Sequence, residues 1–292
     1  MSSAWLLVMR ASSFLLLFWA LLFQACSSHF FYPNQTTYRT PAYYELKYKD
    51  IDFSSKDGTS LHAWYIYPQN TSKGLVFVAH GNAQNISSHF ISWVWLVEQG
   101  YEVFIFDYRE YGKSQGSSSI QGSVEDTLAA LDYLESVYKQ KYVAVGQSLG
   151  GTMLLNALQD RDNSQVKAVV LDSTFVGFSE IASEKMNGVW LTWPFQWIPS
   201  LSLSDDFDAK DRVAGVNKPL LFIHGSLDKI ISANNSWQLF ELSSMPKELW
   251  IVKDAKHIQS LDNANVRKNF LSFLHSPSNY YDANISYMKI YE

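Results

Sequence analysis

Five short, almost uninterrupted apolar runs constrain the fold of this chain more than any other feature. They lie at residues 75–79, 103–106, 142–145, 168–171 and 220–223. Strands without polar alternation are expected where a parallel sheet is covered on both faces. Helical patterns separate the runs, so the alternation predicts right-handed βαβ crossovers in a doubly wound α/β sheet. Upstream, residues 46–53 and 61–67 flank an Asp57-Gly58 turn, which predicts an antiparallel hairpin.

A Gly-x-Ser-x-Gly motif directly follows the third run. Residues 146–151 are Gly-Gln-Ser-Leu-Gly-Gly, and an apolar helical pattern comes next. This strand–turn–helix context is typical of a nucleophile elbow, whose tight turn leaves no room for side chains at the flanking positions. Ser148 is therefore predicted at the carboxyl edge of the sheet, at a helix N-terminus whose dipole favours developing negative charge. The alternative is a glycine-rich turn with a purely structural role.

An acid and a histidine are expected to follow such a serine in that chain order. The run at 220–223 leads into His-Gly-Ser-Leu-Asp and so presents Asp228 at the same sheet edge. Asp228 could instead cap a turn, and three other carboxylates compete weakly because none ends an apolar strand: Asp205, Asp206 and Asp208. His257 lies in the loop after a further strand at 249–252. We predict that His257 is the general base and that Asp228 orients it.

The loop after the first apolar run is a candidate for an oxyanion hole. It reads His-Gly-Asn-Ala at residues 80–83. In the arrangement that an elbow implies, one donor is the backbone N–H after the nucleophile, here Leu149. The second donor comes from the loop after this early strand, and its position favours the backbone N–H of Asn82. The alternative is that His80 and Gly81 only shape a turn.

Together these segments resemble a known family. The motifs are His-Gly-Asn-Ala-Gln-Asn-Ile-Ser at 80–87, Phe-Asp-Tyr-Arg-Glu-Tyr-Gly-Lys-Ser at 106–114, the elbow, Leu-Asp-Ser-Thr-Phe at 171–175 and His-Gly-Ser-Leu-Asp at 224–228. They are similar to the α/β-hydrolase domain-containing proteins that have a His-Gly-Asn-Ala-Gly oxyanion loop. The resemblance spans roughly residues 46–275 and implies the α/β-hydrolase fold. Eukaryotic relatives act on lysophospholipids or protein-bound acyl thioesters, and bacterial members are often described as hydrolases or serine peptidase-like proteins.

Two positions depart from the pattern of that family. Gln84 replaces a glycine of the oxyanion loop, and Glu110 replaces the first glycine of the Asp-Tyr-Arg-Gly-Tyr-Gly turn. Glu110 could alter the fit of a substrate near the pocket, or it could point to solvent. We favour the second interpretation.

A long insertion, residues 176–217, separates the strand that ends near Asp172 from the next one. Its position after the sixth strand is where α/β-hydrolases carry a lid, so we expect a short lid rich in tryptophan here. Its large apolar residues could pack among themselves or contact a ligand: Trp190, Trp193, Phe195 and Trp197. An apolar lid would favour an acyl chain and exclude water.

The N-terminus is expected to be a targeting segment. Residues 1–25 combine a short n-region with an apolar stretch below the ~20 residues of a membrane span, as a signal peptide does. The following Leu-Phe-Gln-Ala-Cys-Ser-Ser resembles a bacterial lipobox, although Phe23 and Gln24 are unusual there. Cys26, the only cysteine, is then the lipidated residue, and Ser27 resembles the residue that sorts lipoproteins to the outer membrane. The alternative is an uncleaved anchor. Residues 26–45 are predicted to be a tether.

Composition limits the functions that the domain at 46–276 can have. The full chain, with 47% hydrophobic and 17% charged residues, can bury a large core, and without a stripe of Lys or Arg it lacks the footprint of a nucleic-acid binder. We expect an exported, membrane-anchored serine hydrolase of esters or thioesters that forms an acyl-enzyme on a small or lipid-like acyl substrate. No metal ion or cofactor is expected. The alternatives are a serine peptidase of the same fold and a non-catalytic binding protein; the tail, 277–292, carries no prediction.

Overall fold

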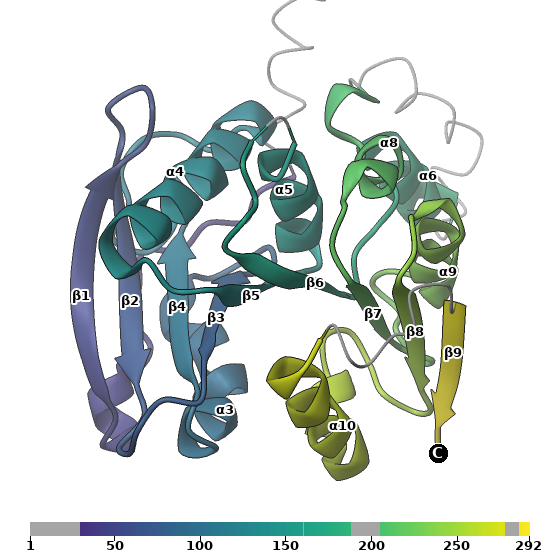
Figure 1. Ribbon diagram of the computed structural model, residues 1–292. Coiled ribbons are helices and arrows are strands. Elements are labelled where there is room, and N and C mark those ends of the chain that lie inside the picture. The colour runs from purple at the N-terminus through teal and green to yellow at the C-terminus, as the bar shows by residue number, and fades with distance from the viewer. Residues whose placement is uncertain (1–29, 160, 188–204, 278–285) are drawn as a thin grey trace, which may run out of the picture.

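Nine strands form one sheet in the residues that the computed structural model describes, which are 30–159, 161–187, 205–277 and 286–292. The strand order is β1-β2-β4-β3-β5-β6-β7-β8-β9 (Figure 1). Their bounds are β1 Lys47–Ser54, β2 Ser60–Tyr67, β3 Leu75–Ala79, β4 Glu102–Asp107, β5 Tyr142–Gln147, β6 Val166–Asp172, β7 Leu220–Gly225, β8 Lys247–Val252 and β9 Ser286–Tyr291. Strand β2 is antiparallel to β1 and β4, and the remaining neighbours are parallel. The predicted parallel sheet and hairpin are confirmed.

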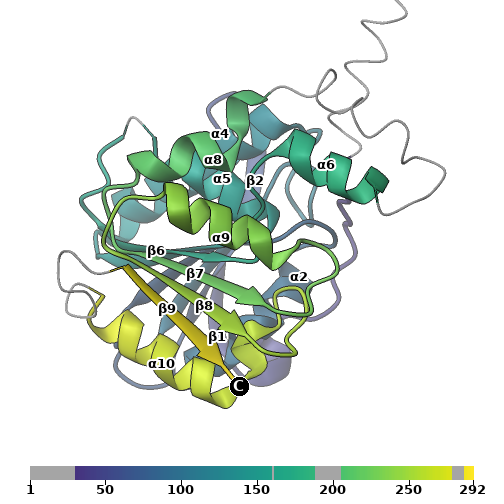
Figure 2. The same cartoon turned by 90° about the vertical axis from the view of Figure 1, so that its right-hand side faces the viewer.

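Helices cover both faces of the sheet, as the two views in Figure 1 and Figure 2 show. One face carries α4 (Ile120–Tyr138), α5 (Leu149–Ala157), α6 (Phe178–Asn187), α8 (Ala209–Arg212) and α9 (Ala233–Leu242). The other carries α2 (Ile86–His89), α3 (Val94–Glu98) and α10 (Ala264–His275). No helix in the described ranges is both long and apolar enough to cross a membrane.

The core lies in two layers, one on each face of the sheet. In β3, Phe77 belongs to the cluster under α4 and α5, whereas Val76 and Val78 belong to the cluster under α3 and α10. All three side chains are fully buried. Because successive residues of a strand point to opposite faces, burial on both sides explains why the strand sequences are apolar without alternation.

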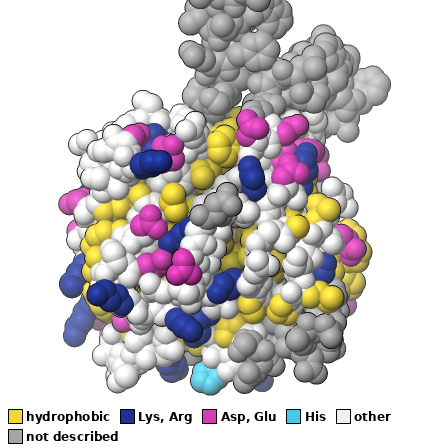
Figure 3. Space-filling model, turned by 45° about the horizontal axis from the view of Figure 1, so that its top comes forward, with side chains coloured by type: hydrophobic (Ala, Val, Ile, Leu, Met, Phe, Trp, Pro, Cys, Tyr) yellow, Lys and Arg dark blue, Asp and Glu magenta, His cyan; other side chains and the backbone are white. Residues whose placement is uncertain are grey.

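Charge on the outside of the molecule is mixed in sign. Figure 3 shows Lys and Arg side chains interspersed with Asp and Glu over the upper side of the molecule, with hydrophobic side chains between them. The described part of the surface seen in this view therefore lacks the continuous positive surface that tracks a phosphate backbone.

Both ends of the described chain contribute to the fold beyond residues 46–276. The segment predicted as a tether packs on the domain from residue 30 onward, because Phe31 is buried in the core and Pro33 pairs with Gln84 in an isolated bridge. It ends in a 3-10 turn at Pro41–Tyr44. In the tail, β9 adds a parallel strand beside β8. The tether prediction is therefore wrong for residues 30–45, whereas Cys26 and the proposed signal peptide lie outside the described residues.

Candidate active site

Ser148 occupies a sharp turn between β5 and α5. Its backbone adopts φ 53° and ψ −118°, and its side chain is almost buried. The flanking glycines are required by close approach: a Cβ on Gly146 would lie 2.4 Å from the Cα of Gly151, and a Cβ on Gly150 would lie 2.1 Å from the carbonyl oxygen of Ala79. The serine is thus held in a strained conformation at the first turn of α5, as a nucleophile elbow requires.

Asp228 and His257 meet directly. His257 Nδ1 lies 2.7 Å from Asp228 Oδ2, and the other carboxylate oxygen accepts the backbone N–H groups of Ile230 and Ile231 at 2.8 and 2.9 Å. His224 Nε2 lies 3.2 Å from Oδ2. Burial alone would raise the pKa of Asp228, but its hydrogen bonds with His224, His257 and Ile231 outweigh that effect and hold the pKa below its usual value. The carboxylate is therefore charged and fixed beside the imidazole.

The elbow and the histidine loop are tied to the same end of β6. The N–H of Ser148 donates to the carbonyl of Asp172 at 2.8 Å, and the N–H of Ile258 donates to Ser173 Oγ at 3.3 Å. Ser148 follows β5, Asp228 follows β7 and His257 follows β8, so all three leave the carboxyl edge of one parallel sheet. Asp205 and Asp206, the competing carboxylates, lie in a 3-10 turn that leads to α8 and does not directly follow a strand. Asp208, the third competitor, accepts the N–H of Phe178 at the start of α6.

The loop after β3 is held in an unusual shape. Ala83 and Gln84 both have left-handed backbones, with φ 68° and 60°. His89 Nε2 lies 3.0 Å from the carbonyl oxygen of Ala83, and burial lowers the pKa of His89, so a neutral imidazole donates to this carbonyl. In the described part of the chain, neither the N–H of Asn82 nor that of Leu149 has a hydrogen-bond acceptor. Two backbone donors are therefore available beside Ser148.

An apolar cavity of about 420 Å³ opens beside the serine. Its described lining comes from the N-terminal segment, the loop after β3, the elbow, α6 and the loop after β7: Phe30, Tyr32, Asn82, Ser148, Leu149, Phe175, Phe178, Ile181, Ala182, Lys185, Ile230 and Ile231. Lys185 is the one charged side chain among them. The predicted lid residues Trp190, Trp193, Phe195 and Trp197 lie outside the described residues.

Glu110 does not line this cavity. Its backbone is left-handed, with φ 72°, and its carboxylate accepts the N–H of Ser118 at 2.8 Å. The side chain therefore closes the turn that leads into α4 and does not shape a substrate pocket. Gln84 is exposed, and its role at this site is through its backbone.

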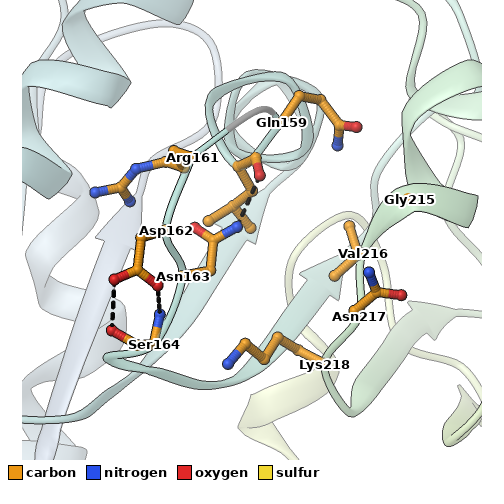
Figure 4. A pocket seen from close by; sticks show the side chains of 10 residues that line it. Gln159, Arg161, Asp162, Asn163, Ser164, Gly215, Val216, Asn217 and Lys218 are labelled. Atoms are coloured by element: carbon orange, nitrogen blue, oxygen red, sulfur yellow. Dashed lines mark hydrogen bonds between the residues drawn. The ribbon is translucent and has the colours of Figure 1, made fainter.

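A second cavity, of about 550 Å³, lies at the opposite edge of the sheet, where the chain enters β6 and β7 (Figure 4). Its polar groups bond mainly to their neighbours. Asp162 accepts the N–H and the hydroxyl of Ser164, and Asn163 Nδ2 donates to the carbonyl of Leu158. Arg161 pairs with two carboxylates of α4. None of the candidate catalytic residues lines this cavity.

Three aromatic residues at the site were not predicted from the sequence. Phe30 and Tyr32 line the cavity, and the hydroxyl of Tyr111 donates to Asn82 Oδ1 at 2.6 Å. The only signal for Tyr111 was its place in the motif at 106–114. The aromatic run at 30–32 gave a weaker signal, because it lies in a polar stretch with turn residues.

Comparison with known proteins gives the family. The sequence model described as serine aminopeptidase, S33, matches residues 70–213, a region that contains Ser148 but ends before Asp228 and His257. The uncharacterized protein YfhR of Escherichia coli K12 is 32% identical over 261 residues, which cover 86% of this chain and 87% of that protein. The α/β-hydrolase domain-containing protein WAV2 of Arabidopsis thaliana is 32% identical over 207 residues, 66% of this chain and 65% of its own.

Solved structures show the same architecture. An esterase of Pyrococcus furiosus superposes with a TM-score of 0.67 at 21% identity, over 84% of this chain and 95% of the esterase. An esterase of Exiguobacterium antarcticum has a TM-score of 0.60 at 17% identity, over 78% and 100% of the two chains. At these identities the likeness concerns the fold. Taken with the sequence relatives and the elbow at the carboxyl edge of the sheet, it shows that this chain belongs to the α/β-hydrolase family.

Proposed function

We propose that the protein is a serine hydrolase that cleaves carboxylic esters or thioesters of acyl groups, with Ser148 as nucleophile, His257 as base and Asp228 as the acid that orients the base. The observation that carries the proposal is the 2.7 Å contact of His257 Nδ1 with a buried Asp228 carboxylate at the sheet edge that presents Ser148. Since Nδ1 is engaged by Asp228, Nε2 is the ring nitrogen left to take the proton of the serine.

The reaction would proceed in two halves. His257 removes the proton of Ser148 as the hydroxyl attacks the acyl carbonyl, and the N–H groups of Asn82 and Leu149 stabilise the resulting oxyanion. The imidazolium then protonates the departing alcohol or thiol, and an acyl-serine remains. A water that loses its proton to His257 attacks that ester, and the collapse of the second tetrahedral intermediate returns the proton to Ser148.

The cavity supports an acyl substrate over a peptide. The matched family model is described as serine aminopeptidase, which makes peptidase activity the second candidate. An aminopeptidase needs an anionic group to bind the substrate ammonium, yet Lys185 is the only charged side chain in the described lining. Apolar walls beside one serine suit a hydrocarbon chain.

The test is labelling with a fluorophosphonate, followed by turnover of p-nitrophenyl esters and aminoacyl p-nitroanilides. We expect labelling and ester turnover in the wild type, and loss of both in Ser148→Ala, with a fall of about 10⁶-fold in kcat. Ser136→Ala, at an exposed serine on α4, is the matched control and should behave as wild type. Turnover of the anilides in preference to the esters would contradict the proposed ester or thioester hydrolase and favour a serine peptidase.

We also propose that Cys26 is lipidated and holds the domain on the periplasmic side of a bacterial outer membrane. The supporting feature is the lipobox-like sequence that ends at the only cysteine. Cys26→Ser should release the protein from membranes, whereas Ser28→Ala should not. Ser27→Asp should shift the protein to the inner membrane. Membrane retention of Cys26→Ser would favour an uncleaved anchor instead.

A further inference from the structure

The N-terminal strap, residues 30–36, runs along the loop after β3 and lies across one side of the candidate site. Phe31 is buried in the core, whereas its neighbours Phe30 and Tyr32 line the apolar cavity. One side chain therefore anchors the strap, and the other two face the substrate space. The ring of Phe30 also packs edge-on against Phe178 of α6, at a centroid distance of 5.7 Å.

The side chain of Asn82 joins the strap to the oxyanion loop. Its Oδ1 accepts the N–H of Tyr32 at 3.0 Å and the N–H of Ala83 at 2.8 Å. Its Nδ2 donates to the carbonyl of Phe30. A single amide thus binds two successive peptide units of the strap and one of its own loop, and Asn82 lines the same cavity as Ser148.

Tyr111 hydrogen-bonds to the same side chain, and Asn82 and Tyr111 together form a clamp on the strap. It is fully buried, and its hydroxyl donates to Asn82 Oδ1 at 2.6 Å. Burial raises the pKa of Tyr111, so the hydroxyl keeps its proton and remains a donor at neutral pH. The backbone N–H of Tyr32 also lies 3.3 Å from the Tyr111 oxygen, which places strap, loop and tyrosine around one polar centre.

A backbone bridge fixes the next residue of the loop. The N–H of Gln84 donates to the carbonyl of Tyr32 at 3.1 Å, and the N–H of Asn34 donates to the carbonyl of Gln84 at 3.1 Å. The bridged loop contains the two left-handed residues, Ala83 and Gln84. Non-glycine residues in this conformation persist only where the surroundings hold them, and the strap supplies part of that support.

We propose that the strap is a working part of the catalytic site: Asn82, through its side chain, and Tyr111 are positioning residues for the oxyanion donor, and Phe30 and Tyr32 form the wall that selects the acyl chain. This inference rests on the proposed serine hydrolase function. The positioning role and the wall role predict different kinetic effects. A misplaced oxyanion donor slows the attack on every ester, whereas a missing apolar wall weakens binding only of chains long enough to reach it.

The experiment compares p-nitrophenyl acetate with p-nitrophenyl octanoate in the full chain, with kcat expressed per active site titrated by a fluorophosphonate. Asn82→Ala and Tyr111→Phe should lower kcat for both esters, on the order of 10²-fold and tenfold respectively, with little change in KM. Phe30→Ala and Tyr32→Ala should raise KM about tenfold for the octanoate alone. Tyr38→Ala, at a half-exposed position just beyond the strap whose backbone N–H bonds to Ser87, is the control.

Tyr111→Phe removes only one hydroxyl, so it decides the matter if Asn82→Ala fails to fold. A purely structural clamp would lower the melting temperature and leave kcat per titrated site unchanged, and that result would overturn the inference. Equal KM changes for acetate and octanoate in the Phe30 and Tyr32 variants would contradict the proposal that these residues select the acyl chain. If the wild type showed neither labelling nor ester turnover, both the proposed function and this inference would be contradicted. If the wild type were active and the variants behaved like it, only this inference would be contradicted.

Discussion

Asp172, at the end of β6, is a buried carboxylic acid at the edge of the site. Burial raises its pKa above the usual 3.8, although Gln147 Nε2 donates to Oδ2 and the Ser173 hydroxyl donates to Oδ1. The raised value means that the folded protein binds this proton more tightly than the unfolded chain does. The protonated Asp172 therefore stabilises the fold fully below about pH 3.8. This contribution to the free energy of unfolding is lost as the pH rises through the folded-state pKa of Asp172.

Asp172→Asn should remove that pH dependence, because an amide stays neutral at every pH. We expect the variant to be at least as stable as the wild type at pH 7 and the two to converge toward pH 4. Urea unfolding between pH 4 and pH 8 measures this difference. The same slope in both proteins would show that Asp172 is ionised in the fold throughout the range.

The backbone conformation of Gln84 leads to a second prediction about stability. Its side chain is exposed and its backbone has φ 60°, a conformation that costs an ordinary residue about 1–2 kcal/mol. Glycine avoids this cost but loses about 0.5–1 kcal/mol more to chain entropy. Gln84→Gly should therefore raise the free energy of unfolding by about 0.5 kcal/mol, measured by urea unfolding.

Glu110→Gly is the comparison for that change. Its φ is 72°, but its carboxylate accepts the N–H of Ser118. Removal of this hydrogen bond should cancel the backbone gain. A larger stabilisation at Glu110 than at Gln84 would contradict this account.

The candidate catalytic residues could be chosen from the sequence because each one lies in the turn or loop that follows a strand. Ser148, Asp228 and His257 follow apolar runs, and a parallel sheet brings the carboxyl ends of its strands to one edge. The positions of Phe30, Tyr32 and Tyr111 have no such local signal. Tyr32 meets Asn82 across 50 positions of chain and Tyr111 meets Asn82 across 29, and these contacts exist only once the sheet has formed.

At the scale of elements, α5 crosses the end of β3 at very close range, because Gly150 lies against the backbone there. A Cβ on Gly150 would lie 2.1 Å from the carbonyl oxygen of Ala79 and 2.5 Å from that of His80. Both are backbone atoms, which cannot turn aside as a side chain could. Gly150→Ala should therefore push α5 away from the sheet and cost about 3 kcal/mol of the free energy of unfolding.

Gly58→Ala provides the matched control for that substitution. Gly58 has φ 87°, and an added Cβ would meet nothing within 4 Å, so only the backbone cost of about 1 kcal/mol applies. Urea unfolding of both variants tests the comparison. Equal losses would mean that α5 can move without cost, and a loss of fluorophosphonate labelling only in Gly150→Ala would place the displacement at the elbow.

The central strands were predictable because both of their faces are buried, so nearly every residue in them is apolar. Strand β9 was not, since it forms an edge of the sheet and exposes Met288 and Ile290. Its residues alternate without a clear apolar face. The packing of residues 30–45 was missed for a related reason: two buried residues, Phe31 and Pro41, and backbone hydrogen bonds hold a segment whose composition resembles a loop.

For the whole molecule, Arg109 joins the N-terminal hairpin to the parallel half of the sheet. Its guanidinium pairs with Asp126 of α4 through two contacts, at 3.0 and 2.8 Å, and with Asp57 in the β1–β2 turn at 3.0 Å. The Asp126 side chain is fully buried. Gly122 leaves room for this arrangement, since a Cβ there would lie 2.5 Å from the guanidinium. Arg109 therefore holds strand, helix and turn together, which explains the arginine of the motif at 106–114 without a catalytic role.

Removal of one partner should damage this junction far more than removal of both. Asp126→Ala leaves a largely buried guanidinium with the partly exposed Asp57 at 3.0 Å and Glu125 at 3.8 Å as its remaining carboxylates in the described residues, and we expect a loss of about 3–5 kcal/mol in the free energy of unfolding. The double variant Arg109→Met with Asp126→Leu exchanges the ion pair for apolar side chains and should recover most of that loss. Urea unfolding of the two variants measures the difference, and fluorophosphonate labelling of the folded double variant checks that Ser148 is unaffected. If the double variant were as unstable as Asp126→Ala, the ion pair itself would be required to dock the hairpin on the sheet.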